Sequence, residues 1–407
     1  MRGRGEGTLF RRADGYWVGG VEIPTADGTR KQKRVVRKSR ADAIKALREL
    51  RKEIDAGRIV TTSNTKFALY IEDWLKTVHQ KDVKPLTFLT DERLMHRHVL
   101  PHLGGKRLDR ITARDIRLAL DKIPMMATRK RAHTLIRKAL NTALYDGMIA
   151  TNPALAVKSP KYQKREYSAF TEEIGNHILR VAESSLDEMW AARFACGLLT
   201  GLRESEVLGL EWDRVDLVND QLLVDWQLQG LRMTHGCGPQ LPNGGWPCGR
   251  NRKPSSCPQA YWDLPEGFEY RVCERHLLWT RPKTKKSERV VPIIAPLKRH
   301  LLKLQATIAP NPHNLVFHHP DGSPFTHSQD QRKWRELLQI AGVDHARQHT
   351  LRKTTATLLR KANVDEQTRM ELFGHATAEV QRGYAQGDWE LQKAALGKLV
   401  AMLELEE

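Results

Sequence analysis

The feature that most constrains the fold is a change of hydrophobic periodicity along the chain, from strands to helices to a mixture of both. Residues 1–60 begin with two strand-like runs, 16–23 and 31–37, joined by a turn at Asp27-Gly28. A run with helical spacing of apolar residues follows at 40–56. This first block therefore predicts a small β-sheet with one helix.

The second block, residues 66–157, is helical, with helices expected at 66–79, 86–100, 113–123 and 127–146 between Pro and Gly breaks. Thr112 and Asp115 resemble a capping box at one helix start. The third block, 168–407, is mostly helical and ends in a helix at 389–405. It also contains two expected hairpins, 217–229 turning at Asn219-Asp220 and 277–294 turning at 284–288. The fold class is mainly α with small β-sheets (α+β).

Charge indicates the kind of partner. The 407-residue chain carries a formal net charge of +19, and residues 1–60 hold 16 Lys/Arg against 8 Asp/Glu, an excess of +8. A polyanion such as DNA would compensate this charge, although a solvated basic surface is the simpler alternative. No stretch approaches ~18 apolar residues and no apolar leader is present, so we expect no membrane partner. The odd number of cysteines, four of them in one segment, favours metal or free thiols over disulfides, and we therefore expect a reducing cytoplasm.

The strongest local motif is Arg203-x-x-Glu206, which follows Thr200-Gly201-Leu202 at a helix start. An arginine at a helix N-terminus suits a phosphate, and a carboxylate three residues on can hold the guanidinium in one rotamer. Alone, the pair could equally be an ordinary surface ion pair.

Two further motifs lie towards the C-terminus. His349-x-x-Arg352 places an imidazole and a guanidinium on one helix face, and Leu372-x-Gly374-His375 precedes Tyr384 by a short interval. Each has an ordinary structural explanation when considered alone.

In this order and spacing, the three motifs resemble the tyrosine recombinase (phage integrase) family over about residues 168–390. The resemblance implies a site-specific DNA recombinase that cuts and rejoins DNA through a 3′-phosphotyrosyl bond to Tyr384. Arg203 and Arg352 would clamp the phosphate, His349 would act as base, and His375 would hydrogen-bond the phosphate. The family also has a lysine on a β-hairpin. Lys283 is the best match for this lysine, which would act as the general acid, with Lys285 and Lys286 as alternatives.

The resemblance also implies the organisation and partners of the protein. Residues 1–60 and 66–157 would bind arm and core DNA sites, and 168–407 would be a mixed α/β catalytic domain. The partners would be double-stranded att-type DNA, a homotetramer on synapsed duplexes, a host bending factor and an excisionase, in the bacterial cytoplasm at the nucleoid. Transesterification needs no cofactor, and the chain has no phosphate-binding G-x-x-x-x-G-K-[ST] loop. The alternatives are a type IB topoisomerase-like enzyme and a catalytically inactive DNA-binding regulator on the same fold.

One segment departs from the family pattern. Residues 231–276 form a Gly- and Pro-rich insertion that contains the histidines His235 and His276 and four of the five cysteines, Cys237, Cys248, Cys257 and Cys273. We predict a structural Zn²⁺ held by the four cysteines, or by three and a histidine. The alternative is a surface loop with free thiols. The fifth cysteine, Cys196, lies in an apolar run and is expected in a core.

Overall fold

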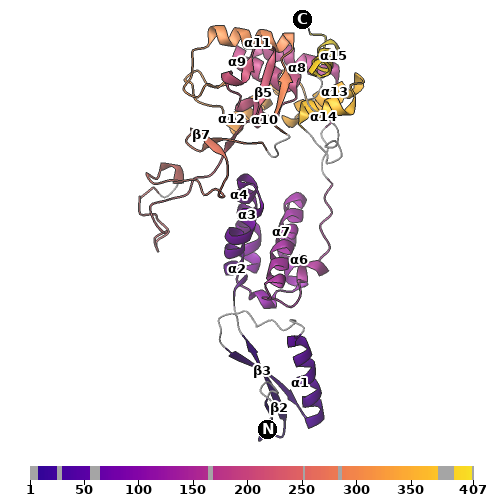
Figure 1. Cartoon of the computed structure of the whole chain (residues 1–407), viewed down its shortest axis with the longest axis vertical. Coiled ribbons are helices and arrows are strands. Elements are labelled where there is room, and N and C mark those ends of the chain that lie inside the picture. Colours follow the sequence, from indigo (N-terminus) through magenta and orange to yellow (C-terminus); the bar gives the residue numbers. More distant parts are fainter. Residues whose placement is uncertain are drawn as a thin grey trace. The chain divides into compact units, whose positions relative to one another are not determined.

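The computed structural model describes residues 8–24, 30–55, 65–163, 168–250, 253–282, 287–374 and 389–405. The chain divides into two compact units, Met1–Lys164 and Arg165–Glu407 (Figure 1).

The first unit begins with a three-stranded antiparallel sheet of order β1-β2-β3, formed by Thr8–Arg11, Trp17–Pro24 and Arg30–Arg37. Helix α1 (Arg40–Asp55) packs on this sheet, and Val21, Leu47 and Leu50 form a small core. Ser39 caps the helix, since its Oγ accepts from the Asp42 backbone N–H at 3.1 Å. The two predicted strands and the helix are confirmed within one residue. β1 was not predicted, and the Asp27-Gly28 turn lies outside the described residues.

The helical part of this unit has its own apolar core. Its helices are α2 (Phe67–Trp74), α3 (Gln80–Asp82), α4 (Pro85–Leu94), α5 (Leu100–Leu103), α6 (Ala113–Asp121) and α7 (Met126–Tyr145). Two π-helical stretches, Leu75–His79 and Met95–Val99, continue α2 into α3 and α4 into α5. The four predicted helices are therefore present, with the first two extended by a further turn. The predicted capping box is also confirmed: Asp115 N donates to Thr112 Oγ1 at 3.2 Å, and Thr112 N donates to Asp115 Oδ2 at 3.0 Å.

A buried carboxylate ties two of these helices together. Asp91 in α4 is 1% exposed and lies 2.8 Å from His79 Nε2, and Arg131 Nε in α7 donates to it at 2.8 Å. Burial acts to raise the pKa of Asp91, but the bonds from His79 and Arg131 outweigh it and leave the pKa below its usual value.

The second unit is built around α9 (Glu188–Thr200), which is buried along most of its length and packs against α8 (Glu172–Ser185), α11 (Ala295–Thr307) and α13 (His349–Lys361). The remaining long helices are α12 (His327–Ile340), α14 (Glu366–Phe373) and α15 (Trp389–Met402). α15 packs on its own domain through Leu396 and Leu399, and Cys196 is fully buried in the same core, as predicted. The described helices include none with the length and apolarity needed to cross a membrane.

Two small sheets complete this unit. One has the order β4-β5-β9, formed by Val215–Asp216, Gln221–Val224 and Arg289–Pro292; the other has the order β6-β8-β7, formed by Gln227–Gly230, Leu277–Thr280 and Tyr270–Glu274. The turn at Asn219-Asp220 is confirmed, with Asp220 at φ 56°. The predicted single hairpin over 277–294 is wrong, because β8 and β9 belong to different sheets. β8 pairs instead with β7, the strand at the C-terminal end of the insertion.

Candidate active site

The site begins at a sharp chain reversal between α9 and the short helix α10 (Glu204–Leu208). Gly201 ends α9 in the left-handed region at φ 64°, and Arg203 then occupies the N-cap of α10. Glu206 lies three residues later and is only 2% exposed. Its carboxylate accepts from Arg203 Nη1 at 2.6 Å and from the Arg203 backbone N–H at 2.9 Å. The predicted pairing of Arg203 with Glu206 is therefore present, and the carboxylate fixes both ends of the arginine.

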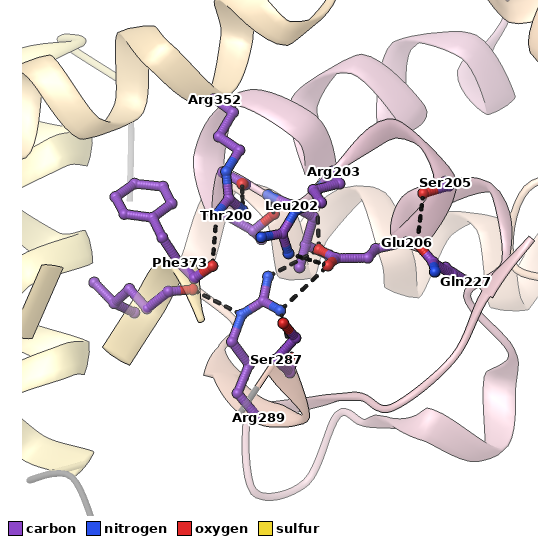
Figure 2. Close-up of polar contacts among 12 residues, drawn as sticks. Thr200, Leu202, Arg203, Ser205, Glu206, Gln227, Ser287, Arg289, Arg352 and Phe373 are labelled. Atoms are coloured by element: carbon purple, nitrogen blue, oxygen red, sulfur yellow. Dashed lines mark hydrogen bonds and ion pairs between the residues drawn. The ribbon is translucent and has the colours of Figure 1, made fainter. Parts of the chain in front are cut away.

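A second guanidinium reaches the same carboxylate from strand β9. Arg289 Nη2 lies 2.9 Å from Glu206 Oε2, and the arginine side chain is 6% exposed (Figure 2). Sequence reasoning did not assign Arg289 to the site. One clue was available: Arg289 lies two residues before the buried Val291, so the two side chains point to the same face of the strand. A basic side chain on that inward face needs a partner.

Arg352 enters from α13 and is anchored by carbonyl groups. Its Nη1 donates to Gly201 O at 2.8 Å and its Nη2 to Phe373 O at 2.5 Å (Figure 2). The guanidinium also lies 4.8 Å from the centroid of the Phe373 ring. Arg352 is 4% exposed, so these contacts hold its head group in one orientation.

The cluster has a surplus of positive charge. Three guanidinium groups (Arg203, Arg289 and Arg352) surround one carboxylate, which gives a formal charge of +3 − 1 = +2. Burial, followed by repulsion from Arg203 and Arg289, lowers the pKa of Arg352 to about 9. Burial acts to raise the pKa of Glu206, but Arg289 and then Arg203 outweigh it and bring the pKa to about 2. Glu206 is therefore ionised at neutral pH, and a bound anion would relieve the remaining repulsion among the arginines.

Two of these arginines also hold the end of α14. Arg289 Nε donates to Leu372 O at 2.8 Å, while Arg352 holds Phe373 O. Gly374 follows in the left-handed conformation at φ 60°. Cations at a helix C-terminus satisfy its last carbonyls and complement its dipole. The residue after this anchored end is His375.

Of the six candidate catalytic residues, the structure brings Arg203 and Arg352 into one cluster. His349 is the first residue of α13, one turn before Arg352, and is exposed. Lys283, His375 and Tyr384 lie outside the described residues.

The insertion contains a compact cluster of metal-ligand types. One ligand atom from each of His235, Cys237, Cys248 and Cys257 lies within 4.8 Å of all the others. His235 Nδ1 is 3.4 Å from Cys248 Sγ and 3.9 Å from Cys237 Sγ. Trp246 stacks on the imidazole with ring centroids 4.3 Å apart.

Cys273 is not part of this cluster, so the structure corrects the predicted four-cysteine set and agrees with the predicted alternative of three cysteines and a histidine. It lies in strand β7 and is 7% exposed, packed in the main apolar core of the unit. Burial and then the nearby Glu274 and Glu211 raise the pKa of its thiol to about 12, which disfavours the thiolate that metal binding requires. His235 is the fourth member of the cluster.

Comparisons with known proteins match both units. The phage integrase family model matches residues 271–390, and the phage integrase N-terminal SAM-like domain matches residues 66–123. An integrase of Saccharopolyspora erythraea is 25% identical, covering 93% of this chain and 92% of that protein. A XerC-like tyrosine recombinase of Caldanaerobacter subterraneus is 26% identical over 75% of each chain.

Solved structures show the same fold. A lambda integrase dimer bound to a COC′ core site gives a TM-score of 0.53 at 16% identity, covering 96% of this chain and 99% of that one. The Tn1549 transposon integrase in complex with circular intermediate DNA gives 0.55 at 18% identity, covering 81% and 98%. The solved structures share the fold, and the family models and relatives together show that this chain belongs to the tyrosine recombinase (phage integrase) family and is a site-specific DNA recombinase.

Proposed function

We propose that this recombinase cuts and rejoins DNA through a transient 3′-phosphotyrosyl bond to Tyr384, integrating and excising a phage or other mobile element. The observation that carries the proposal is the Arg203–Glu206–Arg289–Arg352 cluster, whose net positive charge suits the scissile phosphate. No feature of the described residues favours an inactive regulator or a topoisomerase.

In the proposed reaction, the phenolic oxygen of Tyr384 attacks phosphorus, the P–O5′ bond breaks, and the 5′-hydroxyl leaves. Arg203 and Arg352 stabilise the negative charge that grows on the nonbridging oxygens; losing one such donor typically costs about 100- to 1000-fold in rate. His349 takes the phenolic proton, Lys283 protonates the leaving oxygen, and His375 hydrogen-bonds the phosphate. A 5′-hydroxyl of the partner duplex then attacks the phosphotyrosine and releases Tyr384.

A denaturing gel tests this mechanism. Wild type and Tyr384→Phe are each mixed with nicked duplexes from the DNA that flanks the gene. We expect a covalent protein–DNA adduct with wild type and none with the variant. An adduct of equal yield from both proteins would exclude Tyr384 as the nucleophile.

The wider assembly follows from the relatives. A lambda integrase tetramer has been solved on a Holliday junction. By analogy, four copies of this chain would act on two synapsed att-type duplexes, with residues 1–60 on arm sites, 66–157 on core sites and 168–407 on the cleavage sites. A host bending factor and an excisionase would control direction. Since the named relatives are bacterial, the protein would work in the bacterial cytoplasm on nucleoid DNA.

We also propose that His235, Cys237, Cys248 and Cys257 hold a structural Zn²⁺. A tetrahedral zinc with Zn–S near 2.3 Å and Zn–N near 2.0 Å requires ligand atoms roughly 3.5–4 Å apart. The two distances from His235 Nδ1, 3.4 and 3.9 Å, fit this requirement closely. The metal would cross-link an insertion that has few apolar residues of its own, and the transesterification would not use it. Metal analysis of the purified protein should give one equivalent of zinc; less than about 0.2 equivalents would contradict the proposal.

A further inference from the structure

Helix α10, whose N-cap is Arg203, is too short to hold its own position. It has five residues, Glu204–Leu208, and isolated helices shorter than about 12 residues are marginal in water. Glu206 fixes the start of the helix through its bonds with Arg203 and Arg289. The place to which α10 carries Arg203 therefore also depends on what holds the rest of the helix.

One side and the far end of α10 are bonded to the sheet β6-β8-β7. Ser205 Oγ donates to Gln227 Oε1 of β6 at 3.2 Å (Figure 2), and Trp279 Nε1 of β8 donates to Gly209 O at 2.9 Å. The two backbones also approach closely, since a Cβ at Gly209 would meet Leu228 N at 2.6 Å. The helix thus lies directly against this sheet.

A further bond comes from the insertion. Glu211 follows α10 by three residues and is a buried carboxylate, 5% exposed. Arg271 of β7 binds both of its oxygens: Nη1 donates to Oε1 at 3.0 Å, and Nη2 donates to Oε2. Among the described residues, Arg271 is the one ion-pair partner of Glu211. The last strand of the insertion therefore compensates a buried charge in the segment that carries Arg203.

Two indole rings fix the plane of the Arg271 guanidinium. Its Cζ lies 4.5 Å from the centroid of the Trp226 ring and 4.8 Å from that of Trp279, the residue that also bonds Gly209. A planar guanidinium can stack on aromatic rings and bind a carboxylate through two parallel bonds at the same time, whereas a lysine ammonium cannot. The contacts are therefore specific for arginine at this position.

We propose that Arg271 is a positioning residue for Arg203: from the end of the insertion it holds Glu211 and Trp279 against α10, and so sets the place of the arginine that binds phosphate. The inference rests on the proposed function, in which Arg203 contacts the scissile phosphate. Arg271 acts through α10 and not on the DNA. The insertion thereby supports the active site, in addition to carrying the cysteine–histidine cluster.

The first test measures strand cleavage per folded molecule in single-turnover reactions. A misplacement of about 1 Å can cost about 100-fold in rate, so we expect Arg271→Ala to lose about 10- to 100-fold. Arg271→Lys keeps the charge but loses the stacked, bidentate geometry, and should recover only part of the rate. Arg275→Ala, on the same hairpin with a side chain 80% exposed, should cleave like wild type. Equal rates for Arg271→Ala and Arg275→Ala would overturn the proposal.

Combination with Arg203→Ala distinguishes positioning from a general loss of structure. If Arg271 acts through Arg203, adding Arg271→Ala to Arg203→Ala should lower the remaining rate by less than about twofold. A further loss as large as the one in the wild-type background would mean that Arg271 acts independently of Arg203, and would overturn the proposal.

Backbone hydrogen exchange provides a readout that needs no DNA. The amides of Val207 and Gly209, which donate to Arg203 O and Ser205 O within α10, should exchange about tenfold faster in Arg271→Ala than in wild type, while the middle of α9 is unchanged. Unchanged exchange at both amides would show that Arg271 does not hold α10. If Arg271→Ala fails to fold, Arg271→Lys takes its place in all three comparisons. If wild type forms no adduct, the proposed function fails, and the exchange data still decide whether Arg271 holds the helix.

Discussion

Arg289 and Glu206 are 83 positions apart in the chain, yet their side chains form a buried ion pair with Nη2 2.9 Å from Oε2. This pair joins strand β9 to helix α10 and, through Arg289 Nε, to the last turn of α14. The carboxylate that orients Arg203 therefore depends on a residue outside all three sequence motifs.

Arg289→Ala should impair both folding and catalysis. Among the described residues it leaves the buried Glu206 with Arg203 as its remaining hydrogen-bonded ion-pair partner, and removing one member of a buried pair typically costs about 3–5 kcal/mol. The pKa of Glu206 should rise from about 2 as its main stabilising partner is lost. Thermal unfolding measures the loss of stability, and the yield of protein–DNA adduct per folded molecule measures the loss of catalysis. Arg332→Ala, an exposed change in α12, is the control for loss of charge alone. Unchanged stability of Arg289→Ala would contradict a stabilising ion pair between Arg289 and Glu206.

Gly201→Ala should reduce cleavage by displacing Phe373. A Cβ at Gly201 would meet Phe373 Cε1 at 2.3 Å, and Phe373 carries the carbonyl that anchors Arg352. Gly342→Ala is a matched control, because Gly342 has nearly the same φ, 63° against 64°, and nothing lies within 4 Å of its added Cβ. The control should lose only the roughly 1–2 kcal/mol of left-handed strain. Gly201→Ala should lose more stability than this and also cleavage, measured by unfolding and by adduct formation. Equal effects of the two changes would mean that the contact with Phe373 is unimportant.

His235→Ala should abolish zinc binding, whereas His276→Ala should not. Both histidines lie in the insertion, but only His235 has its Nδ1 within reach of Cys237 and Cys248, and His276 is exposed outside the cluster. Zinc content and the melting temperature before and after chelation are the measurements. Cys273→Ser should retain zinc; loss of metal from it would restore the four-cysteine site.

Asp91→Asn should remove an acid-sensitive contribution to stability in the helical block. The pKa of Asp91 is lowered in the folded state, so the stability it contributes is present above its unfolded pKa of about 4 and is lost as pH falls through the folded value. Backbone hydrogen exchange in α4 and α7, followed from pH 7 downward, reports this locally. The variant should exchange faster at pH 7, with a cost of about 1–3 kcal/mol. The difference in exchange rate between the variant and wild type should become smaller at acidic pH. Asp82→Asn, whose side chain is 51% exposed and pairs with Lys138, should show little change at any pH.

The sequence was most informative where the signal is local. Helix periodicity, the capping box of Thr112 with Asp115, and the Arg203–Glu206 spacing all depend on residues within one or two turns of each other, and the structure confirms them. The pairing of strands was harder to predict from the sequence. β8 and β9 are as close in sequence as the two strands of a hairpin, but β8 pairs with β7 and β9 pairs with β5.

The partners of the site residues were also beyond sequence reasoning. Arg289 is an ordinary charged residue until long-range folding buries it against Glu206. Likewise, cysteine spacing alone could not distinguish Cys273 from the other three. Its position on a β-strand directs its thiol into the apolar core, and the direction of a side chain cannot be predicted from the spacing of the cysteines.

The two ends of the insertion meet: Leu231 N donates to His276 O at 2.8 Å, beside the paired strands β6, β8 and β7. A loop that leaves and re-enters a scaffold at nearly the same point can change length without moving its anchors. The part of the insertion that precedes β7 can therefore change in length while the paired strands β6, β8 and β7 keep their places. For the experimenter, the exposed turn around Asn243 and Gly244 offers a place to insert a fluorescent tag or an affinity epitope with which to follow the protein on DNA.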